Sequence, residues 1–244
     1  MFDGLRLAVT TLTVLPVRAG RWDRPTAAVA MSLAPLVGAA LGLALAAINE
    51  GLRWLGSPAL VAAGVAVAAG ALLTRGLHLD GLADTVDALG SYRSGPDALQ
   101  IMKKADIGPF GVAAVALTAL IQAAALTTSG PWTIVTAWAA GRLAITIACR
   151  RGVPAARPEG LGAMVASSVP TPVVLAAAAA VAGLAAAATP GRPWQGPAAV
   201  LLAGAVVVLL VHHCVRRFGG TTGDVLGASV EVATTVTLIA LTFD

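Results

Sequence analysis

Three aspartates stand within eight positions of an otherwise apolar segment, "GLHLDGLADTVDALG", residues 76–90. Asp80, Asp84 and Asp87 occupy positions i, i+4 and i+7, so a helix projects all three carboxylates from one face. Carboxylates this close repel one another unless a cation lies among them. Mg²⁺ prefers oxygen ligands and is commonly shared by a pair of carboxylates and the phosphates of a substrate. The spacing therefore predicts metal-assisted chemistry on a phosphorylated compound, and the alternative is a solvated acidic face at a helix end.

A second segment, "GGTTGDVLGASVE" at residues 219–231, combines glycines with hydroxyls and acids. The glycines permit positive φ and close backbone approach, and Asp224 can cap a helix that continues into the last apolar stretch. Free N–H groups at a helix start attract phosphate. The residues that we predict to contact substrate phosphates here are Arg216, Arg217, Gly219, Gly220, Thr222 and Gly223. The alternative is an ordinary glycine-rich turn whose arginines anchor the cytoplasmic ends of spans.

Glu231 follows Asp224 by seven residues, so both share a helix face and lie about 10 Å apart along the axis. A carboxylate within a span needs a partner, and Arg142 is the base inside another span. These two residues predict either a structural ion pair or a role in binding metal or substrate, and the sequence leaves both open. His78, two positions before Asp80, is a candidate metal ligand, proton carrier or phosphate partner, or else a hydrogen-bonded residue at the membrane boundary.

The elements that must position these residues are membrane helices. The 244 residues are 57% hydrophobic and 11% charged, with a mean hydropathy of +0.84, whereas about a quarter of the residues in soluble domains are charged. A helix needs about 20 apolar residues to cross the bilayer. Seven stretches satisfy this, at residues 27–48, 58–77, 107–128, 131–149, 171–189, 196–214 and 224–243.

We therefore predict an all-α fold, a polytopic integral membrane bundle of about seven transmembrane helices, as a single domain over residues 1–244. Residues 1–25 form an N-terminal segment at the membrane surface, and residues 78–106 form an acidic connection. Thirteen of the sixteen basic residues fall on the side that carries these two segments, against two on the other side. Because short cytoplasmic loops retain positive charge, the N-terminus and the acidic connection are expected in the cytoplasm, in a multi-pass protein of the cell membrane.

The net charge of +4 follows from this topology and favours contact with anionic lipid or phosphate, and it gives no reason to expect nucleic-acid binding. Cys149 and Cys214 are too few for a disulfide framework, and we expect both to serve in packing.

Several motifs, in order, resemble those of cobalamin synthases, the adenosylcobinamide-GDP ribazoletransferases. "HLDGLADTVD" (78–87) resembles the family stretch H-x-D-G-x-x-D-x-x-D-G, and "GGTTGDVLGASVE" resembles G-G-x-T-G-D-x-L-G-A-x-x-E. "IMKKADIGPFG" (101–111) and "EGLG" (159–162) fall in the expected order between them, and "LTVLPV" resembles the N-terminal segment of the family. The resemblance spans nearly the whole chain, and its three ordered motifs make it specific.

The resemblance implies an integral membrane transferase that joins adenosylcobinamide-GDP to α-ribazole or its 5′-phosphate, releases GMP and requires Mg²⁺. On this basis Asp80, Asp84 and Asp87 are catalytic with His78, and Asp224 and Glu231 join the three aspartates as metal ligands. The residues expected to bind substrate are Lys103, Lys104, Arg142, Arg216, Arg217, Gly219, Gly220, Thr222 and Gly223. A homo-oligomer is left open.

The chain departs from the family pattern at two places. Ala88 stands where the family has Gly after the third Asp, so the helix can continue there instead of turning. Lys104 and Ala105 replace the Asp and Ser that commonly follow the basic residue, which leaves a catalytic role for Asp106 unassigned.

The sequence supports three other functions less well. CDP-alcohol phosphotransferases have a similar aspartate spacing, but the Ala-Arg of their motif is absent. A small transporter would carry its ionisable groups near the midplane and an internal repeat, whereas these residues gather at one face. A scaffold for soluble enzymes leaves the aspartates unexplained.

Overall fold

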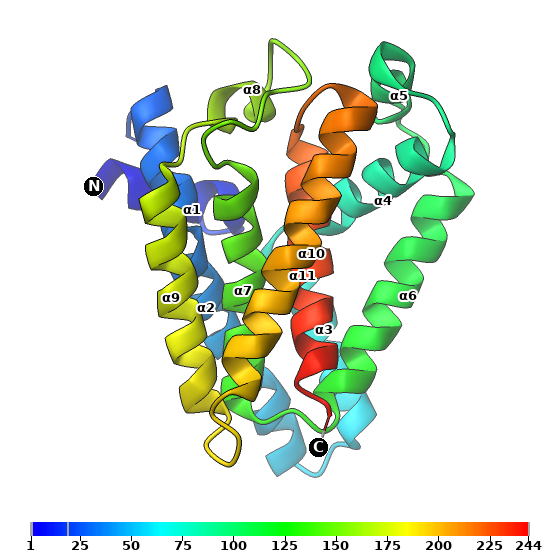
Figure 1. The fold of residues 1–244 in the computed structure, drawn as a ribbon. Helices are drawn as coiled ribbons and strands as arrows, with labels where there is room; N and C mark the ends of the chain where they lie inside the picture. Colours follow the sequence, from blue (N-terminus) through cyan, green and yellow to red (C-terminus); the bar gives the residue numbers. More distant parts are fainter. Residues whose placement is uncertain (1, 19, 244) are drawn as a thin grey trace.

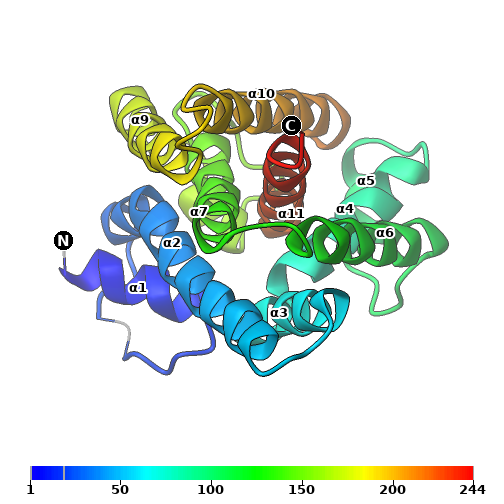
Figure 2. The same cartoon turned by 90° about the horizontal axis from the view of Figure 1, so that it is seen from below.

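Helix α7 (Pro131–Ala148) runs through the middle of the molecule and packs against α2, α9, α10 and α11 (Figures 1 and 2). Its residues from Ile134 to Ala148 are all buried. The computed structural model describes residues 2–18 and 20–243. The other helices of this part are α1 (Phe2–Leu12), α2 (Arg24–Trp54), α3 (Ala59–Leu73), α4 (Leu77–Gly90), α5 (Gly95–Ile101), α6 (Pro109–Leu126), α8 (Leu161–Val165), α9 (Thr171–Ala188), α10 (Gln195–Phe218) and α11 (Gly223–Ala240).

The predicted all-α membrane bundle is confirmed. Five helices, α2, α6, α9, α10 and α11, are long and apolar enough to cross a membrane, and α3 with α4 adds a sixth if the two count as one broken span. The stretch predicted at 131–149 is α7, which is not among them because Arg142 and three threonines lower its hydropathy. Neighbouring helices surround α7, so its polar residues face protein rather than lipid.

The chain bends by 88° between α3 and α4. Arg75 and Gly76 adopt left-handed backbone conformations at the bend, with φ of 57° and 68°, and such residues end a right-handed helix. The stretch predicted as a span at 58–77 therefore stops at Leu73. α4 lies across one end of the bundle (Figure 1), so the acidic connection predicted at 78–106 consists mostly of α4 and α5.

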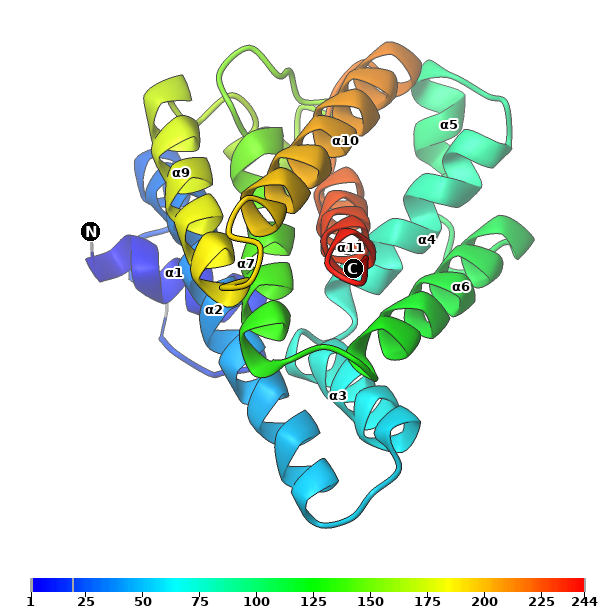
Figure 3. The ribbon, with the colours of Figure 1, turned by 60° about the horizontal axis from the view of Figure 1, so that its bottom comes forward.

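The segments predicted to share the cytoplasmic side gather at one end of the bundle. Figure 1 shows α1 lying across the bundle axis near this upper end, together with α4, α5, α8 and the turn between α10 and α11. The opposite end, which comes forward in Figure 3, carries the turns after α2, α6 and α9. The grouping of the connections is as predicted from the basic residues, and the side of the membrane that each end faces remains a prediction.

Two glycines allow α4 and α11 to cross at backbone contact. A side chain at Gly81 would place its Cβ 2.7 Å from the carbonyl oxygen of Asp224. Across the same crossing, a Cβ at Gly227 would lie 3.2 Å from the Cα atoms of Gly81 and His78. The first distance is shorter than a Cβ tolerates and the second would force the neighbouring backbone to shift, so these glycines set how closely the two helices approach.

Candidate active site

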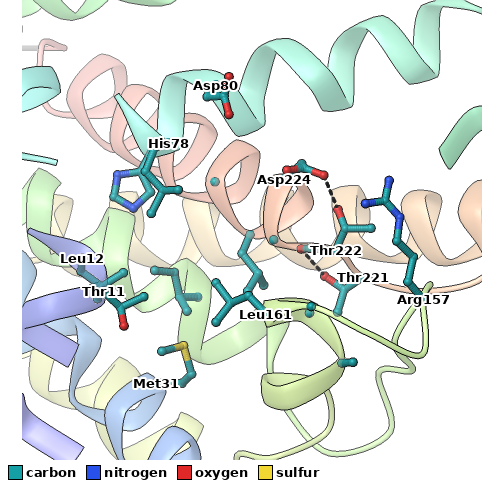
Figure 4. Close-up of a pocket in the computed structure, with 18 of the residues that line it drawn as sticks. Thr11, Leu12, Met31, His78, Asp80, Arg157, Leu161, Thr221, Thr222 and Asp224 are labelled. Atoms are coloured by element: carbon teal, nitrogen blue, oxygen red, sulfur yellow. Dashed lines mark hydrogen bonds between the residues drawn. The ribbon is translucent and has the colours of Figure 1, made fainter. Parts of the chain in front are cut away.

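The acids of the two distant segments meet where α4 crosses α11. We call Asp80 and Asp84 of α4 with Asp224 of α11 the acid cluster. Asp80 and Asp224 line one cavity (Figure 4). Burial, together with the charges of Asp224, Asp80 and Asp87, raises the pKa of Asp84 to about 6. The structure therefore brings together the two acidic segments that the sequence picked out.

Asp87, the third predicted aspartate, has a positioning role. Its Oδ2 accepts a hydrogen bond from the backbone N–H of Gly108 at 2.7 Å, and its Oδ1 accepts one from Gly111 at 2.9 Å. A carboxylate stabilises the start of a helix by meeting such free N–H groups. A Cβ at either glycine would clash with this carboxylate. The "IGPFG" stretch thus fixes the start of α6 on the acidic face of α4.

No ion pair within 4.0 Å involves the acids of the cluster in the part of the chain that the structure describes. The ion pair found there within 4.0 Å joins Arg53 to Glu50, in the last turn of α2. Among residues 2–18 and 20–243, no group of three or more His, Cys, Asp or Glu side chains is arranged to hold a metal ion by itself. A few carboxylates that form no close ion pair fit an ion such as Mg²⁺, which takes its remaining ligands from water and substrate phosphates.

Arg157, which sequence reasoning missed, is the cation that acts on the cluster. Its charge lowers the pKa of Asp84, against the larger effects that raise it. Its Nη2 donates a hydrogen bond of 2.8 Å to the carbonyl of Leu99. The strand-like pairing of Ala156 with Thr221 (N–H to carbonyl, 2.9 Å) ties this segment to the turn before α11. The segment is irregular, so no periodicity in the sequence pointed to it.

The cavity beside the cluster has a volume of about 290 Å³ and two unlike sides. Figure 4 shows Asp224, Thr222 and Arg157 on one side, and Leu12, Met31 and His78 on the other. The cavity can therefore bind a ligand that has both a charged part and an apolar part.

His78 lies in this cavity wall and does not join the acid cluster as a counter-ion. Its side chain is 2% exposed, and neither ring nitrogen has a hydrogen-bond partner within the described residues. Burial, with the charge of Arg142, holds the pKa of His78 well below its usual range. The ring is therefore neutral, with one N–H and one free acceptor.

A second cavity of about 330 Å³ lies further along the acidic face of α4, where Asp84 and Asp87 meet Arg93 and Lys104. A third, of about 670 Å³, adjoins Asp80 and Asp84 and is also lined by Lys104. Asp84 thus lines the cavities on this face, while Asp80 and Asp224 line the first cavity. The acids can be approached from two directions.

The turn before α11 has partly the predicted role. Thr222 caps α11, because its Oγ1 accepts from the N–H of Val225 at 3.2 Å, and it also donates to Oδ2 of Asp224 at 3.2 Å. Thr222 and Gly223 line the first cavity. Gly219 ends α10 with a φ of 86°, and Gly220 packs directly against the backbone of residues 154–156. These two glycines therefore shape the turn and do not line the cavity.

Of the predicted basic residues, only Lys104 lines a cavity that the acid cluster shares. Lys103 and Arg216 are exposed and line none of the three cavities. Arg217 donates a hydrogen bond of 2.6 Å to the carbonyl of Arg93, which ties α10 to the segment before α5. The structure does not bring these three residues to the acids.

Glu231 and Arg142 line a separate small cavity of about 20 Å³ inside the bundle. Glu231 accepts a hydrogen bond of 2.9 Å from Nε2 of Gln122, whose side chain also donates to Thr235. No ion pair within 4.0 Å joins Glu231 to Arg142 among the described residues. Sharing a helix face with Asp224 did not bring Glu231 to the cluster, because Glu231 lies two turns further into the bundle, where Gln122 of α6 binds it.

Ala88, one departure from the family pattern, lies fully buried within α4, which continues to Gly90. The expectation of a continued helix at this position is confirmed.

Comparison with known proteins covers nearly the whole chain. Residues 4–242 match the family described as cobalamin-5-phosphate synthase. A protein of Nocardioides sp. is 44% identical over 243 residues, which cover 98% of each chain, and one of Frankia casuarinae is 42% identical over 97% of this chain and 93% of its own. A relative in Bradyrhizobium diazoefficiens is 36% identical over 96% of this chain and 91% of its own. All three are named adenosylcobinamide-GDP ribazoletransferase.

No solved structure matches the chain. The family match and these relatives cover the acid cluster, the segment of Arg157 and the turn before α11. The chain therefore belongs to the cobalamin-5-phosphate synthase family.

Proposed function

We propose that this protein transfers the phosphorylated cobinamide of adenosylcobinamide-GDP to α-ribazole or its 5′-phosphate and releases GMP. The relatives carry this activity in their name. The observation that carries the proposal is the acid cluster, in which carboxylates from α4 and α11 meet beside two cavities and form no ion pair within 4.0 Å among the described residues. Such a site suits a reaction whose two substrates must meet at a diphosphate.

In this reaction a ribose hydroxyl of the acceptor attacks the phosphorus that is attached to cobinamide. A new P–O bond forms, the P–O bond to GMP breaks in line with it, and the hydroxyl proton passes to a carboxylate of the cluster. Phosphoryl transfer of this kind depends mainly on positioning the reactants and on neutralising charge. The transfer is direct, so no side chain of the protein has to form a covalent bond with the substrate.

The residues that hold the diphosphate surround the acid cluster. Asp80, Asp84 and Asp224 are the donors that fit Mg²⁺, which when bound neutralises the phosphate oxygens and the leaving GMP. Arg157 reaches the cluster from one side and Lys104 from the other, and both are suited to phosphate oxygens. Asp87 positions α4 against α6. We assign no role in this step to Glu231, Arg216 or Arg217.

The charge distribution favours a cytoplasmic active face in the cell membrane, because the end that carries the cluster also carries thirteen of the sixteen basic residues. Both substrates are then expected to arrive from the cytoplasm. A transport function lacks support, since the acid cluster lies at one end of the bundle.

The direct test is GMP release by the purified protein in lipid with adenosylcobinamide-GDP, α-ribazole and Mg²⁺. The wild type should release GMP, and the Asp84→Asn variant should release very little. Asp97→Asn is the matched control, because Asp97 is an exposed acid on α5 outside the cavities described above. Folded wild-type protein that binds both substrates without releasing GMP would contradict the proposal.

A further inference from the structure

The first cavity has an apolar part that phosphate chemistry does not explain. Leu12 of α1, Met31 of α2, Ile145 of α7 and Leu226 of α11 line it, and each is at most 4% exposed. Figure 4 shows Leu12 and Met31 across the cavity from Asp224 and Arg157. Four helices thus converge on an apolar wall that faces the charged side of the site.

His78 is the buried titratable group of this wall, on which Thr11 of α1 lies beside Leu12. It lies 2% exposed in the cavity lining, with both ring nitrogens unpartnered among residues 2–18 and 20–243. A buried polar group without a partner is costly, so native proteins seldom leave one unmet. The nitrogens are closed to water here, and a turn of the ring about its side-chain bonds is needed to present one of them to a ligand.

The size of the cavity separates the two substrates. Sites for small ligands hold about 300–1,000 Å³, and this cavity of about 290 Å³ is too small for a corrin macrocycle. It suits a nucleoside. The apolar wall suits a largely apolar base better than guanine, whose donors and acceptors would have to be met by the polar lining residues Thr11, Arg157 and Glu159.

We propose that the apolar part of this cavity binds the base of the acceptor, a planar and largely apolar aromatic heterocycle with one free ring nitrogen. The N–H of His78 donates to that nitrogen, and the ribose extends toward Asp80 and Asp224. This assignment rests on the proposed function and adds to it the place of the acceptor. It makes His78 a binding residue and leaves the proton transfer to the carboxylates.

The first experiment tests whether His78 donates a hydrogen bond to the free ring nitrogen of the acceptor base. The KM for α-ribazole is compared with that for an indole riboside, in which a C–H replaces the free nitrogen, in the wild type and in His78→Phe. The wild type should discriminate by about tenfold, the effect of one buried hydrogen bond, and His78→Phe should not discriminate. A variant that keeps the wild-type ratio would overturn the role of His78.

The second experiment fills the cavity. Ala163 lines it and is half-buried on α8, so Ala163→Phe reduces its volume without disturbing the bundle core. The KM for α-ribazole should rise about tenfold or more, since the occupant meets an added ring, while the KM for adenosylcobinamide-GDP should stay unchanged. Ala116→Phe, on an exposed position of α6 outside the cavities, is the control. A rise confined to the donor KM would assign the cavity to the guanine nucleotide and overturn the proposal.

Direct binding separates this inference from the proposed function. Equilibrium binding of radiolabelled α-ribazole to the lipid-embedded wild type and to Ala163→Phe needs no turnover. Weaker binding by the variant supports the cavity assignment even if the wild type releases no GMP. Equal binding by the two proteins overturns it even if the wild type is active.

Discussion

The backbone N–H of Gly108 donates a hydrogen bond of 2.7 Å to the carboxylate of Asp87, which lies 21 residues earlier in the chain. This contact joins the N-cap residue of α6 to the last acid of the α4 face, and the N–H of Gly111 in the first turn of α6 donates to the same carboxylate at 2.9 Å. Asp87 therefore fixes the start of α6 against α4, the helix that carries Asp80 and Asp84.

Asp87→Asn should lower thermal stability, because the amide presents only one acceptor oxygen to two N–H groups. The loss of one charged hydrogen bond that stabilises a helix start costs about 1–3 kcal/mol. Unfolding can be followed by the reaction of a maleimide dye with Cys149 and Cys214, which are buried in the folded protein. Gly108→Ala should be destabilising as well, since its Cβ would meet the carboxylate. Unchanged melting in both variants would remove the positioning role of Asp87.

Asp84→Asn should have the opposite effect on the metal-free protein. The pKa of Asp84 is raised to about 6 in the folded state, chiefly by burial, so its ionisation destabilises the fold as the pH rises above its ordinary pKa of about 4, and the loss is complete above about 6. In the presence of EDTA the variant should melt at a higher temperature than the wild type. The difference should grow as the pH rises from about 4 through about 6. A variant less stable than the wild type at pH 7 would show that the acid is not under repulsive strain.

Arg157→Ala should reduce GMP release by about 100-fold, the usual cost of losing one fixed donor to a developing charge. Arg157→Lys should recover only part of the rate, because lysine lacks the planar guanidinium. Arg216→Ala is the matched control, since Arg216 is exposed at the end of α10 and lines none of the cavities around the acids. Equal losses from the two alanine variants would point to the general positive charge of this end of the bundle.

Glu231→Gln should impair stability more than chemistry. The change leaves the buried Arg142 without the acid of its cavity, and an uncompensated buried charge costs about 3–5 kcal/mol. The melting temperature should fall and should recover in part when Arg142→Met is added. The affinity for Mn²⁺, measured by electron paramagnetic resonance, should remain that of the wild type. A large loss of that affinity would return Glu231 to the metal site.

The orientation of the bundle can be tested in intact cells with single cysteines in a protein whose Cys149 and Cys214 are replaced. A membrane-impermeant maleimide should label Gly191→Cys, in the exposed turn after α9, and should not label Ser94→Cys, an exposed position before α5. The reverse pattern would place the acid cluster outside the cell.

The part of the site that follows from local spacing could be predicted from the sequence. The i, i+4, i+7 pattern predicted a helix with three aspartates on one face, and this stretch is helical in the structure, as α4. The motif beginning at Gly219 led to Thr222, Gly223 and Asp224. Length and hydropathy also gave the all-α membrane class.

The part of the site that depends on tertiary contacts could not be predicted from the sequence. Asp87 is bound by α6 because Gly108 and Gly111 approach it from a later segment. Arg157 reaches the cluster only through the pairing of its irregular segment with Thr221. Spacing alone put Glu231 beside Asp224, whereas Gln122 of another helix decides its surroundings.

The central claim is that carboxylates of α4 and α11 form one cation site, and Mn²⁺ binding to the lipid-embedded protein tests it most directly. Electron paramagnetic resonance would give the Kd of the wild type, of Asp84→Asn, of Asp224→Asn and of the exposed control Asp97→Asn. Weakening by about tenfold or more in both cluster variants, with no change in the control, is the predicted result. If Asp84→Asn weakens binding and Asp224→Asn does not, or if neither does, the two helices do not share a cation and the account is contradicted.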